Sequence, residues 1–410
     1  MAGDGQTVWA GGTVAWDAAG RLTYAGPAAG APPPFGRVFD LDGWTVLPGL
    51  IDCHVHLASH SGPEPVHFAF WGVATPPAEK LLHAWRNART ALRSGVTTLR
   101  NMGERGVGEP SLRDAINQGV VPGPRILTSA SVITMTGGHA DLFTPAALPR
   151  EPGATADGPD AVRQAVRADV RAGADFIKFT ATGGVLSALT TPSQRNYSPE
   201  EVAALVDEAH ALERRTAAHA HGTTGIKNAL RAGVDTLEHG TMLDEEAIDL
   251  LVGSGAVLVP TLTIEERIVS RGVELGISAA NVDKARRVFD VHRESVRAAH
   301  AAGVPIAMGT DSSGNVCPFG GHARELVLLQ ECGLAPLAAL AAGTGVAAAA
   351  LGLGGVVGTL APGAVADLVA VPKDLLADVG QLSVQAPVVW QAGELVSGAE
   401  RLPAPEVRAS

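Results

Sequence analysis

Short apolar segments alternate with amphipathic helical segments through the middle of the chain, and this alternation constrains the fold more than any other feature. The apolar segments occupy residues 46–52, 97–103, 125–131, 175–181, 216–222, 235–241, 256–262 and 305–311. The clearest helical segments between them are residues 79–95, 160–174, 199–215 and 288–303. Eight such strand–helix alternations predict an α/β fold of the (β/α)8 TIM-barrel type. The main rival is a doubly wound sheet, which would carry a glycine-rich phosphate loop after an early strand, and no such loop occurs in a suitable place.

The two ends of the chain have a different pattern, with short strand-like pieces split by glycine and proline. Neither end is large enough to bury a good core alone. We therefore expect residues 1–47 and 357–410 to pair into one small β-sandwich domain formed by both chain ends. Residues 48–356 would then form the barrel domain.

Composition and charge exclude several classes of partner. The net charge is −11, from 31 Lys and Arg against 42 Asp and Glu, whereas nucleic acid and anionic lipid both need a basic face. The three cysteines form no CxxC pair and suit a reducing compartment. No signal-peptide pattern opens the chain. We expect a cytoplasmic homo-oligomer that acts on a small-molecule substrate.

One uncharged stretch, residues 332–366, is long enough for a membrane span. It consists mostly of alanine and glycine, with Pro336 and Pro362 near its ends. We interpret it as a buried, close-packed helix followed by turns, so we expect no membrane segment.

Several apolar segments end in residues that can bind a divalent metal. These residues are His54, His56, Lys178, His219, His239 and Asp311. Side chains on a strand alternate between faces, so His54 and His56 point the same way. Catalytic groups of a barrel lie at the carboxyl ends of its strands. Imidazole and carboxylate ligands suit zinc, and less specifically manganese, iron or cobalt.

Lys178 lies inside an apolar strand, where a bare ammonium is costly to bury. Three interpretations are open: a deprotonated Schiff-base lysine of an aldolase, a structural ion pair with an aspartate, or a lysine carboxylated by CO2 to a carbamate between two metals. The neighbouring histidines and Asp311 favour the carbamate.

The sequence resembles the amidohydrolase superfamily in five segments: PGLIDCHVHL, IKFTATGG, HAHG, EHG and GTDSS. The resemblance covers nearly the whole chain and extends to LAPGAVADLVAV near its end. It is greatest to the imidazolonepropionase-like and prolidase-like branch, which has a carboxylated lysine and a binuclear metal site. Relatives often carry Arg-Asp where this chain has Arg100 and Asn101.

The resemblance implies a role for each ligand. His54 and His56 would bind the more buried of two divalent ions, most simply Zn²⁺, and a CO2-derived carbamate on Lys178 would bridge the pair. His219 and His239 would bind the second ion. Asp311 would bind the first ion and shuttle protons.

Four further residues are candidates for substrate contact or catalysis. His221 competes with His219 as the ligand and, if it is not one, could touch substrate. His139, on the loop after the third strand, is either a substrate contact or a plain loop residue. Tyr197 could polarise the scissile carbonyl, and Arg195 could hold a carboxylate; both could also be ordinary loop residues.

These residues predict a metal-dependent hydrolase of carbon–nitrogen bonds. We expect a metal-activated hydroxide to hydrolyse an amide in a small carboxylate-bearing substrate, either a dipeptide such as Xaa-Pro or an N-acyl amino acid. The alternatives are a cyclic-amide hydrolase of the imidazolonepropionase type, a Schiff-base aldolase, and a non-catalytic scaffold relative. A scaffold would usually have lost ligands, and all six are present here.

Overall fold

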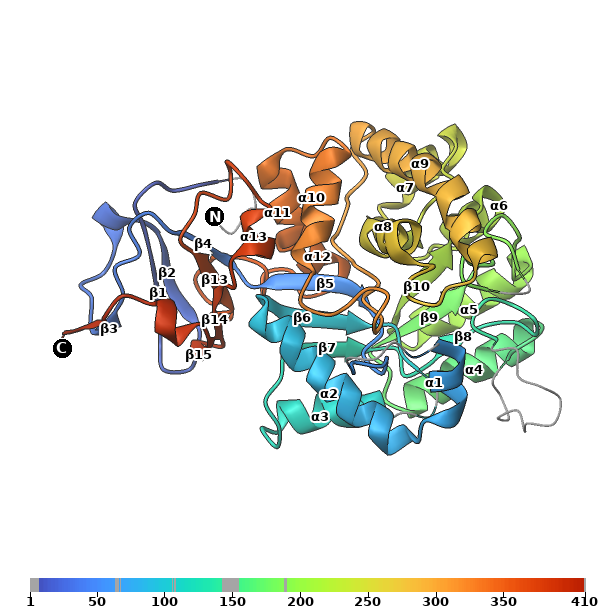
Figure 1. Ribbon diagram of the computed structural model, residues 1–410, viewed down its shortest axis with the longest axis horizontal. Helices are drawn as coiled ribbons and strands as arrows, with labels where there is room; N and C mark the ends of the chain where they lie inside the picture. The colour runs from blue at the N-terminus through green and yellow to red at the C-terminus, as the bar shows by residue number, and fades with distance from the viewer. Residues whose placement is uncertain are drawn as a thin grey trace.

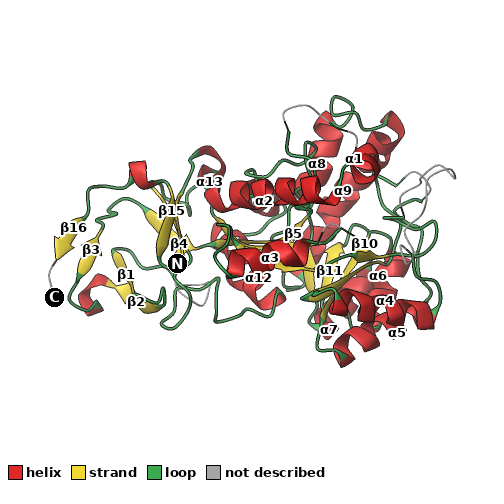
Figure 2. Cartoon of the chain, turned by 90° about the horizontal axis from the view of Figure 1, so that it is seen from below, coloured by secondary structure: helices red, strands yellow, loops and turns green. Residues whose placement is uncertain are grey.

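The computed structural model describes residues 7–62, 66, 68–104, 106, 108–141, 155–187 and 190–408. It has a mixed α/β structure, as predicted. A larger part contains parallel strands with helices around them, and a smaller part consists mainly of antiparallel strands (Figure 1). In a view turned by 90°, helices lie on both sides of the parallel strands (Figure 2).

The parallel strands lie in two sheets. They are β5 (Leu50–Val55), β6 (Val96–Asn101), β7 (Arg125–Thr128), β8 (Val132–Ile133), β9 (Phe176–Thr180), β10 (Arg215–Ala220), β11 (Thr236–His239) and β12 (Val257–Val259). The sheet orders are β5-β6-β7 and β8-β9-β10-β11-β12, so within each sheet every strand pairs with the next in the chain. Strands β5, β6, β9 and β11 are buried at every position. Burial on both faces is typical of parallel strands that helices cover.

Residues 305–312 join the two sheets. The backbone N–H of Leu258 in β12 donates to Pro305 O at 2.9 Å, and the N–H of Cys53 in β5 donates to Met308 O at 2.9 Å. This segment therefore lies between the last parallel strand and the first.

Gly309 allows this close approach. A Cβ at this position would lie 2.4 Å from Val259 Cγ1 and 2.9 Å from His54 Cβ, which is far inside van der Waals contact. The missing side chain lets the segment pass between β12 and β5, and it brings Asp311 beside the strand that carries His54.

Helix starts and stops follow local sequence signals. Helix α5 (Pro199–Ala211) begins with a capping box, in which Ser198 and Glu201 satisfy each other's backbone N–H groups. Helix α7 (Glu245–Ser254) has Asp244 as its N-cap and ends at Gly255, whose φ of 69° is left-handed. The caps set where α5 and α7 begin and where α7 ends, and so where the chain turns back toward strands β10 and β12.

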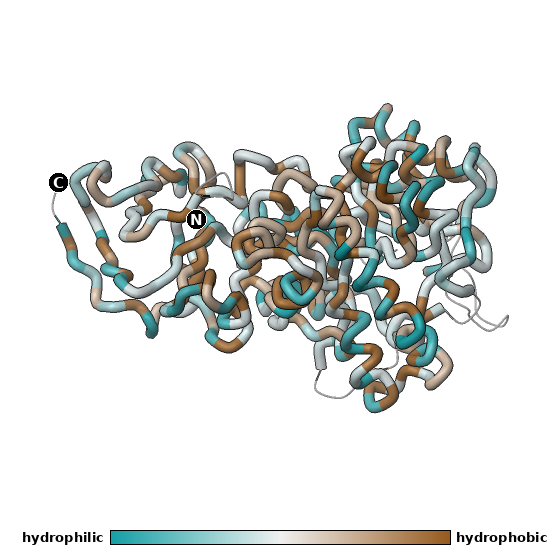
Figure 3. Tube along the Cα trace, turned by 90° about the horizontal axis from the view of Figure 1, so that it is seen from above, coloured by the Kyte–Doolittle hydropathy of each residue, from teal (hydrophilic) through white to brown (hydrophobic). Residues whose placement is uncertain are grey.

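The other helices of the larger part are α1 (Phe68–Ala74), α2 (Pro77–Arg93), α3 (Glu109–Asn117), α4 (Pro159–Arg171), α6 (Thr223–Arg231), α8 (Leu262–Arg271), α9 (Ala279–Ala301), α10 (Ala323–Glu331), α11 (Pro336–Ala342), α12 (Gly345–Ala350) and α13 (Gln381–Val384). Figure 3 shows hydrophobic stretches on the segments that run through the interior, with hydrophilic ones on outer helices.

The smaller part is built from both chain ends. Its strands are β1 (Gly12–Trp16), β2 (Leu22–Pro27), β3 (Gly36–Val38), β4 (Thr45–Pro48), β13 (Leu368–Val371), β14 (Val388–Gln391), β15 (Glu394–Ser397) and β16 (Glu406–Arg408), with short 3-10 helices η1 (Ala28–Gly30) and η2 (Ala399–Arg401). Strand β4 pairs antiparallel with β13, and β3 pairs with β16. Trp390 packs here against Trp16, with ring centroids 6.3 Å apart. The predicted domain boundaries stay a prediction.

The uncharged stretch 332–366 forms two short helices, α11 and α12, rather than one. The helices are separated at Gly343 and Thr344, and most of their alanines are buried. Among the described residues, no helix combines the length and hydropathy that a membrane span requires.

Candidate functional site

The six predicted metal ligands converge on one cavity of about 110 Å³. They come from the ends of β5, β10 and β11, from the middle of β9, and from the segment after β12. The side chains that line the cavity include His54, His56, Lys178, His219, His239 and Asp311. Their convergence follows from parallel strands whose carboxyl ends meet at one edge.

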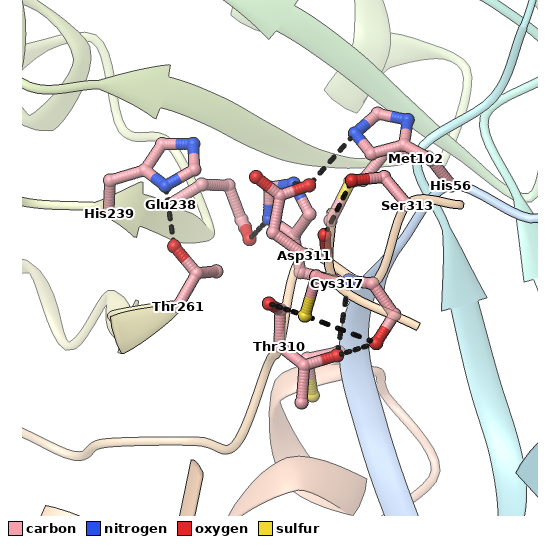
Figure 4. A network of polar contacts seen from close by, with 12 residues as sticks. His56, Met102, Glu238, His239, Thr261, Thr310, Asp311, Ser313 and Cys317 are labelled. Atoms are coloured by element: carbon pink, nitrogen blue, oxygen red, sulfur yellow. Dashed lines mark hydrogen bonds and ion pairs between the residues drawn. The ribbon is translucent and has the colours of Figure 1, made fainter. Parts of the chain in front are cut away.

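His54, His56 and Asp311 form the first group of donor atoms. Asp311 Oδ1 lies 3.3 Å from His56 Nε2 and 3.7 Å from His54 Nε2, and Figure 4 shows the contact with His56. Burial opposes ionisation of Asp311, but the two histidines outweigh it and hold the pKa of its carboxyl at about 2. Burial lowers the pKa of His54 to about 4, so its imidazole is neutral at pH 7.

Glu238 orients His54, and sequence reasoning missed it. Its Oε2 accepts a hydrogen bond from His54 Nδ1 at 2.8 Å, and its Oε1 accepts from Arg100 Nη2 at 2.7 Å. Burial alone would raise the pKa of Glu238, but Arg100 and His54 lower it to about 2. With Nδ1 engaged, His54 presents Nε2 to the cavity, which is the usual arrangement of a histidine that binds metal. The sequence signal that could have indicated this pair is the presence of opposite charges, Arg100 in β6 and Glu238 in β11, inside two buried strands.

His219, His221 and His239 form the second group, and their ring nitrogens lie within 4.8 Å of one another. His221 Nδ1 is bonded to Thr241 Oγ1, and His239 Nδ1 to Thr261 Oγ1, both at 2.6 Å. These bonds leave Nε2 of both rings for the cavity. His221 thus lies beside His219, and the choice between them as ligand stays open.

Lys178 lines the same cavity from the middle of β9. Burial lowers the pKa of its amine to about 8. A neutral amine reacts with CO2 and an ammonium does not. Burial therefore favours the form from which a carbamate would be made.

Two candidate ligands of the site, and the threonine that holds one of them, have a left-handed backbone that residues other than glycine rarely adopt. His239 has φ 68°, Thr261 φ 58° and Asp311 φ 54°. Each such residue costs on the order of 1 kcal/mol and persists only where its surroundings enforce it. His239 and Asp311 line the cavity, and Thr261 is bonded to His239.

The family model described as "Amidohydrolase family" matches residues 45–396. The chain belongs to the amidohydrolase family. As a member, it is a hydrolase that acts on amide bonds.

This amidohydrolase has relatives in the predicted branch. It is 33% identical over 377 residues to an ochratoxinase of Aspergillus niger, and the aligned region covers 86% of this chain and 76% of the relative. It is 30% identical over 403 residues to an imidazolonepropionase of Rhizorhabdus wittichii, which covers 90% of each. A solved structure of a Xaa-Pro dipeptidase with methionine bound in its active site superposes with a TM-score of 0.85, at 33% identity and with 94% of each chain covered.

The donor atoms of this amidohydrolase fit divalent metal ions. Each of the two groups gathers at least three ligand atoms within 4.8 Å. The histidines of the site whose Nδ1 is fixed by Glu238, Thr241 or Thr261 can bind only through Nε2. Neutral imidazoles beside one carboxylate are a set that suits zinc.

Of the three predicted loop residues, His139 lies at the cavity, whereas Tyr197 and Arg195 do not line it. His139 lines the cavity, with its ring stacked on His219 at a centroid distance of 4.3 Å. A Cβ at Gly184 would lie 2.3 Å from the His139 ring, so the glycine makes room for it. Tyr197 is buried and donates from its hydroxyl to Ala156 O at 3.1 Å, and Arg195 is exposed.

Neither Tyr197 nor Arg195 is among the described residues that line the cavity. Arg195 Nη1 instead donates to the carbonyl oxygen of Tyr197 at 3.2 Å. Their roles in catalysis and substrate binding stay predictions.

Asn101, which departs from the family pattern, supports the loop after His56. Its Oδ1 accepts a hydrogen bond from the backbone N–H of Leu57 at 2.8 Å. Asn101 also contacts Glu109, which is 2% exposed and whose pKa burial raises to about 8. An aspartate at 101 would place a second acid beside Glu109 and would raise the cost of ionising either of the two.

Glu109 predicts a pH-dependent stability. The unfolded side chain has a pKa of about 4.3, so the folded protein keeps a proton that the unfolded chain loses. The contribution of Glu109 to the free energy of unfolding should therefore be complete below about pH 4 and be lost as pH rises to 8, by a few kcal/mol. Glu109→Gln should flatten this fall, measured by urea unfolding at about pH 5 and about pH 8. Glu245→Gln, at an exposed residue, is the control, and equal slopes in wild type and Glu109→Gln would contradict the assignment.

Proposed function

We propose that this amidohydrolase hydrolyses the amide bond of a small carboxylate-bearing substrate, either a dipeptide such as Xaa-Pro or an N-acyl amino acid. The observation that carries the proposal is the meeting of two groups of metal donors and Lys178 in one cavity. The similarity to a Xaa-Pro dipeptidase over 94% of each chain supports the substrate class. The similarity to an imidazolonepropionase keeps cyclic-amide hydrolysis as the alternative.

For the architecture, we propose that β5 to β12 and residues 305–312 close into one (β/α)8 barrel, with β7 and β8 as a single bent strand. The hydrogen bonds of residues 305–312 to both β12 and β5 support closure. The two chain ends would form the β-sandwich beside it.

In this proposal, His54, His56 and Asp311 hold one metal ion, and His219 and His239 hold the second, with His221 as a further donor. A carbamate on Lys178 would supply an anionic ligand shared by the two. When bound, the ions polarise an amide carbonyl and acidify water so that it can attack near neutral pH.

Asp311 carries the proton transfer. Its carboxylate is ionised at neutral pH because His54 and His56 hold its pKa at about 2. It accepts the proton of the attacking water and delivers it to the leaving nitrogen, as general base and then general acid. His139 and His221 line the cavity and can contact the substrate around the scissile bond.

The proposal predicts about two divalent metals per chain and loss of hydrolysis on chelation. Metal analysis of the purified protein is followed by assays of dipeptides, N-acyl amino acids and a cyclic imidazolone, before and after chelation and with zinc restored. Full activity in metal-free protein would contradict the proposal. Hydrolysis of the imidazolone alone would establish the alternative substrate class. Borohydride trapping of a carbonyl substrate on Lys178 would instead indicate a Schiff-base lyase.

A further inference from the structure

Glu265 is a buried acid on the cavity wall that the proposed chemistry does not use. It lies in the first turn of α8, is 2% exposed, and lines the cavity beside Ile264 and Ile268. A carboxyl group in such a wall is costly unless its oxygens find partners. Among the described residues, one of its two oxygens has a hydrogen-bond partner and the other has none.

The partnered oxygen is Oε2. It lies 2.9 Å from Nδ1 of His292, a fully buried residue of α9. The other ring nitrogen, Nε2 of His292, donates to the backbone carbonyl oxygen of His239 at 2.8 Å. The ring is thus fixed at both nitrogens and holds the carboxyl group in place.

The unpartnered oxygen is Oε1, which is buried and has no hydrogen-bond partner among the described residues. The nearby Nδ1 of His221 lies 4.0 Å away and is already bonded to Thr241 Oγ1. His292 Nε2 must carry a proton, because it faces a carbonyl oxygen. The hydrogen bond between His292 Nδ1 and Glu265 Oε2 then contains one further proton, which is carried either by Nδ1 or by Oε2. In both arrangements Oε1 is a hydrogen-bond acceptor.

The rest of the cavity limits what this acceptor can receive. Two acidic side chains line it among the described residues, Glu265 and Asp311. Asp311 belongs to the first group of metal donors. Glu265 is therefore the acidic group left for a substrate, in a cavity whose other ionisable side chains are histidines and Lys178.

We propose that Glu265 Oε1 binds the free α-ammonium group of the substrate, so that unblocked dipeptides are preferred over N-acyl amino acids. This proposal rests on the proposed function and narrows it. The scissile nitrogen of an Xaa-Pro bond carries no hydrogen. The terminal ammonium group of the dipeptide is therefore the main hydrogen-bond donor that this substrate can offer. A carboxyl oxygen without a partner matches that donor and gives a strong, charge-assisted hydrogen bond.

The test compares methionyl-proline with N-acetyl-methionyl-proline, using metal-loaded wild type and Glu265→Leu, which has a similar size but no oxygen to accept a hydrogen bond. The variant should lower kcat/KM for the free dipeptide by about 10- to 100-fold, the size of a lost hydrogen bond to a charged group. It should change the acetylated substrate by less than about threefold. Glu266→Leu is the matched control, because Glu266 is the next residue of α8 and pairs with Arg324.

Calorimetry of methionine and N-acetylmethionine binding gives a readout that does not need hydrolysis. Weaker binding of methionine alone in Glu265→Leu would support the proposal. Equal losses for the free and acetylated ligands, or no loss, would overturn it. If metal-loaded wild type hydrolyses neither dipeptide, the dipeptide form of the proposed function fails, while the binding result still decides the role of Glu265. Metal content and melting temperature are measured for every variant to exclude misfolding.

Discussion

Asp311→Asn should lower kcat by about 10²–10⁴-fold, the contribution of a positioned acid–base group, with a smaller change in KM. Asparagine is nearly the same size and still offers an oxygen, so most of the metal should remain. It cannot accept a proton from the attacking water. The Oδ1 contacts of Asp311 with His54 and His56 are geometrically possible for the amide oxygen as well. The variant therefore separates metal binding from proton transfer.

The measurement pairs steady-state kinetics with metal analysis of the same sample, and Asp249→Asn at an exposed residue of α7 is the control. A kcat that drops by less than about tenfold, with the metals in place, would show that Asp311 is not the proton shuttle. His221 and His139, which line the same cavity, would then be the next candidates.

Lys178→Ala should lose most of the bound metal and lower kcat/KM by at least about 100-fold, because loss of an outer partner of a ligand alone costs about 10- to 100-fold. The proposed carbamate is an anion among neutral histidines, and alanine cannot form it. A short-chain carboxylic acid such as propionate can enter the space that is left and supply an anion. We expect added propionate to restore part of both metal content and activity.

Lys373→Ala, at an exposed lysine, is the control for general effects of removing an amine. Near-normal metal content and rate in Lys178→Ala would rule out the carboxylated lysine. Intact mass measured under denaturing conditions does not decide the point, because a carbamate is lost when the protein unfolds. Metal content and carboxylate rescue are therefore the deciding measurements.

The sequence predicts this site as far as strand geometry reaches. His54 and His56 could be found because the two-residue period of a strand puts them on one face, and Lys178 because it is a charge inside an apolar strand. Glu238 carries the same signal, but nothing in the sequence indicates that it faces Arg100 and His54 across three strands. Such pairings are set by how the strands close on one another.

Residues outside the strands were harder to predict, for a different reason. Glu265 lies in a segment where glutamate is ordinary for an exposed helix, and its burial depends on how α8 packs against α9. Tyr197 occupies a polar loop, yet its ring is buried with its hydroxyl on Ala156. The sequence pattern of a loop does not specify the packing of its side chains.

The order in which the ribosome makes the chain separates the two donor groups. His219, His221 and His239 lie on and just after neighbouring strands, 20 residues apart, and can meet soon after both strands emerge. His54 lies on β5 and His56 directly after it. Strand β5 follows β4 after a single residue, and β4 finds its partner only when β13 is made. Asp311 also arrives late. Long-range pairing of this kind is slow. In a nascent chain, the edge of β5 that will pair with residues 305–312 therefore stays unpaired until most of the protein has been synthesised.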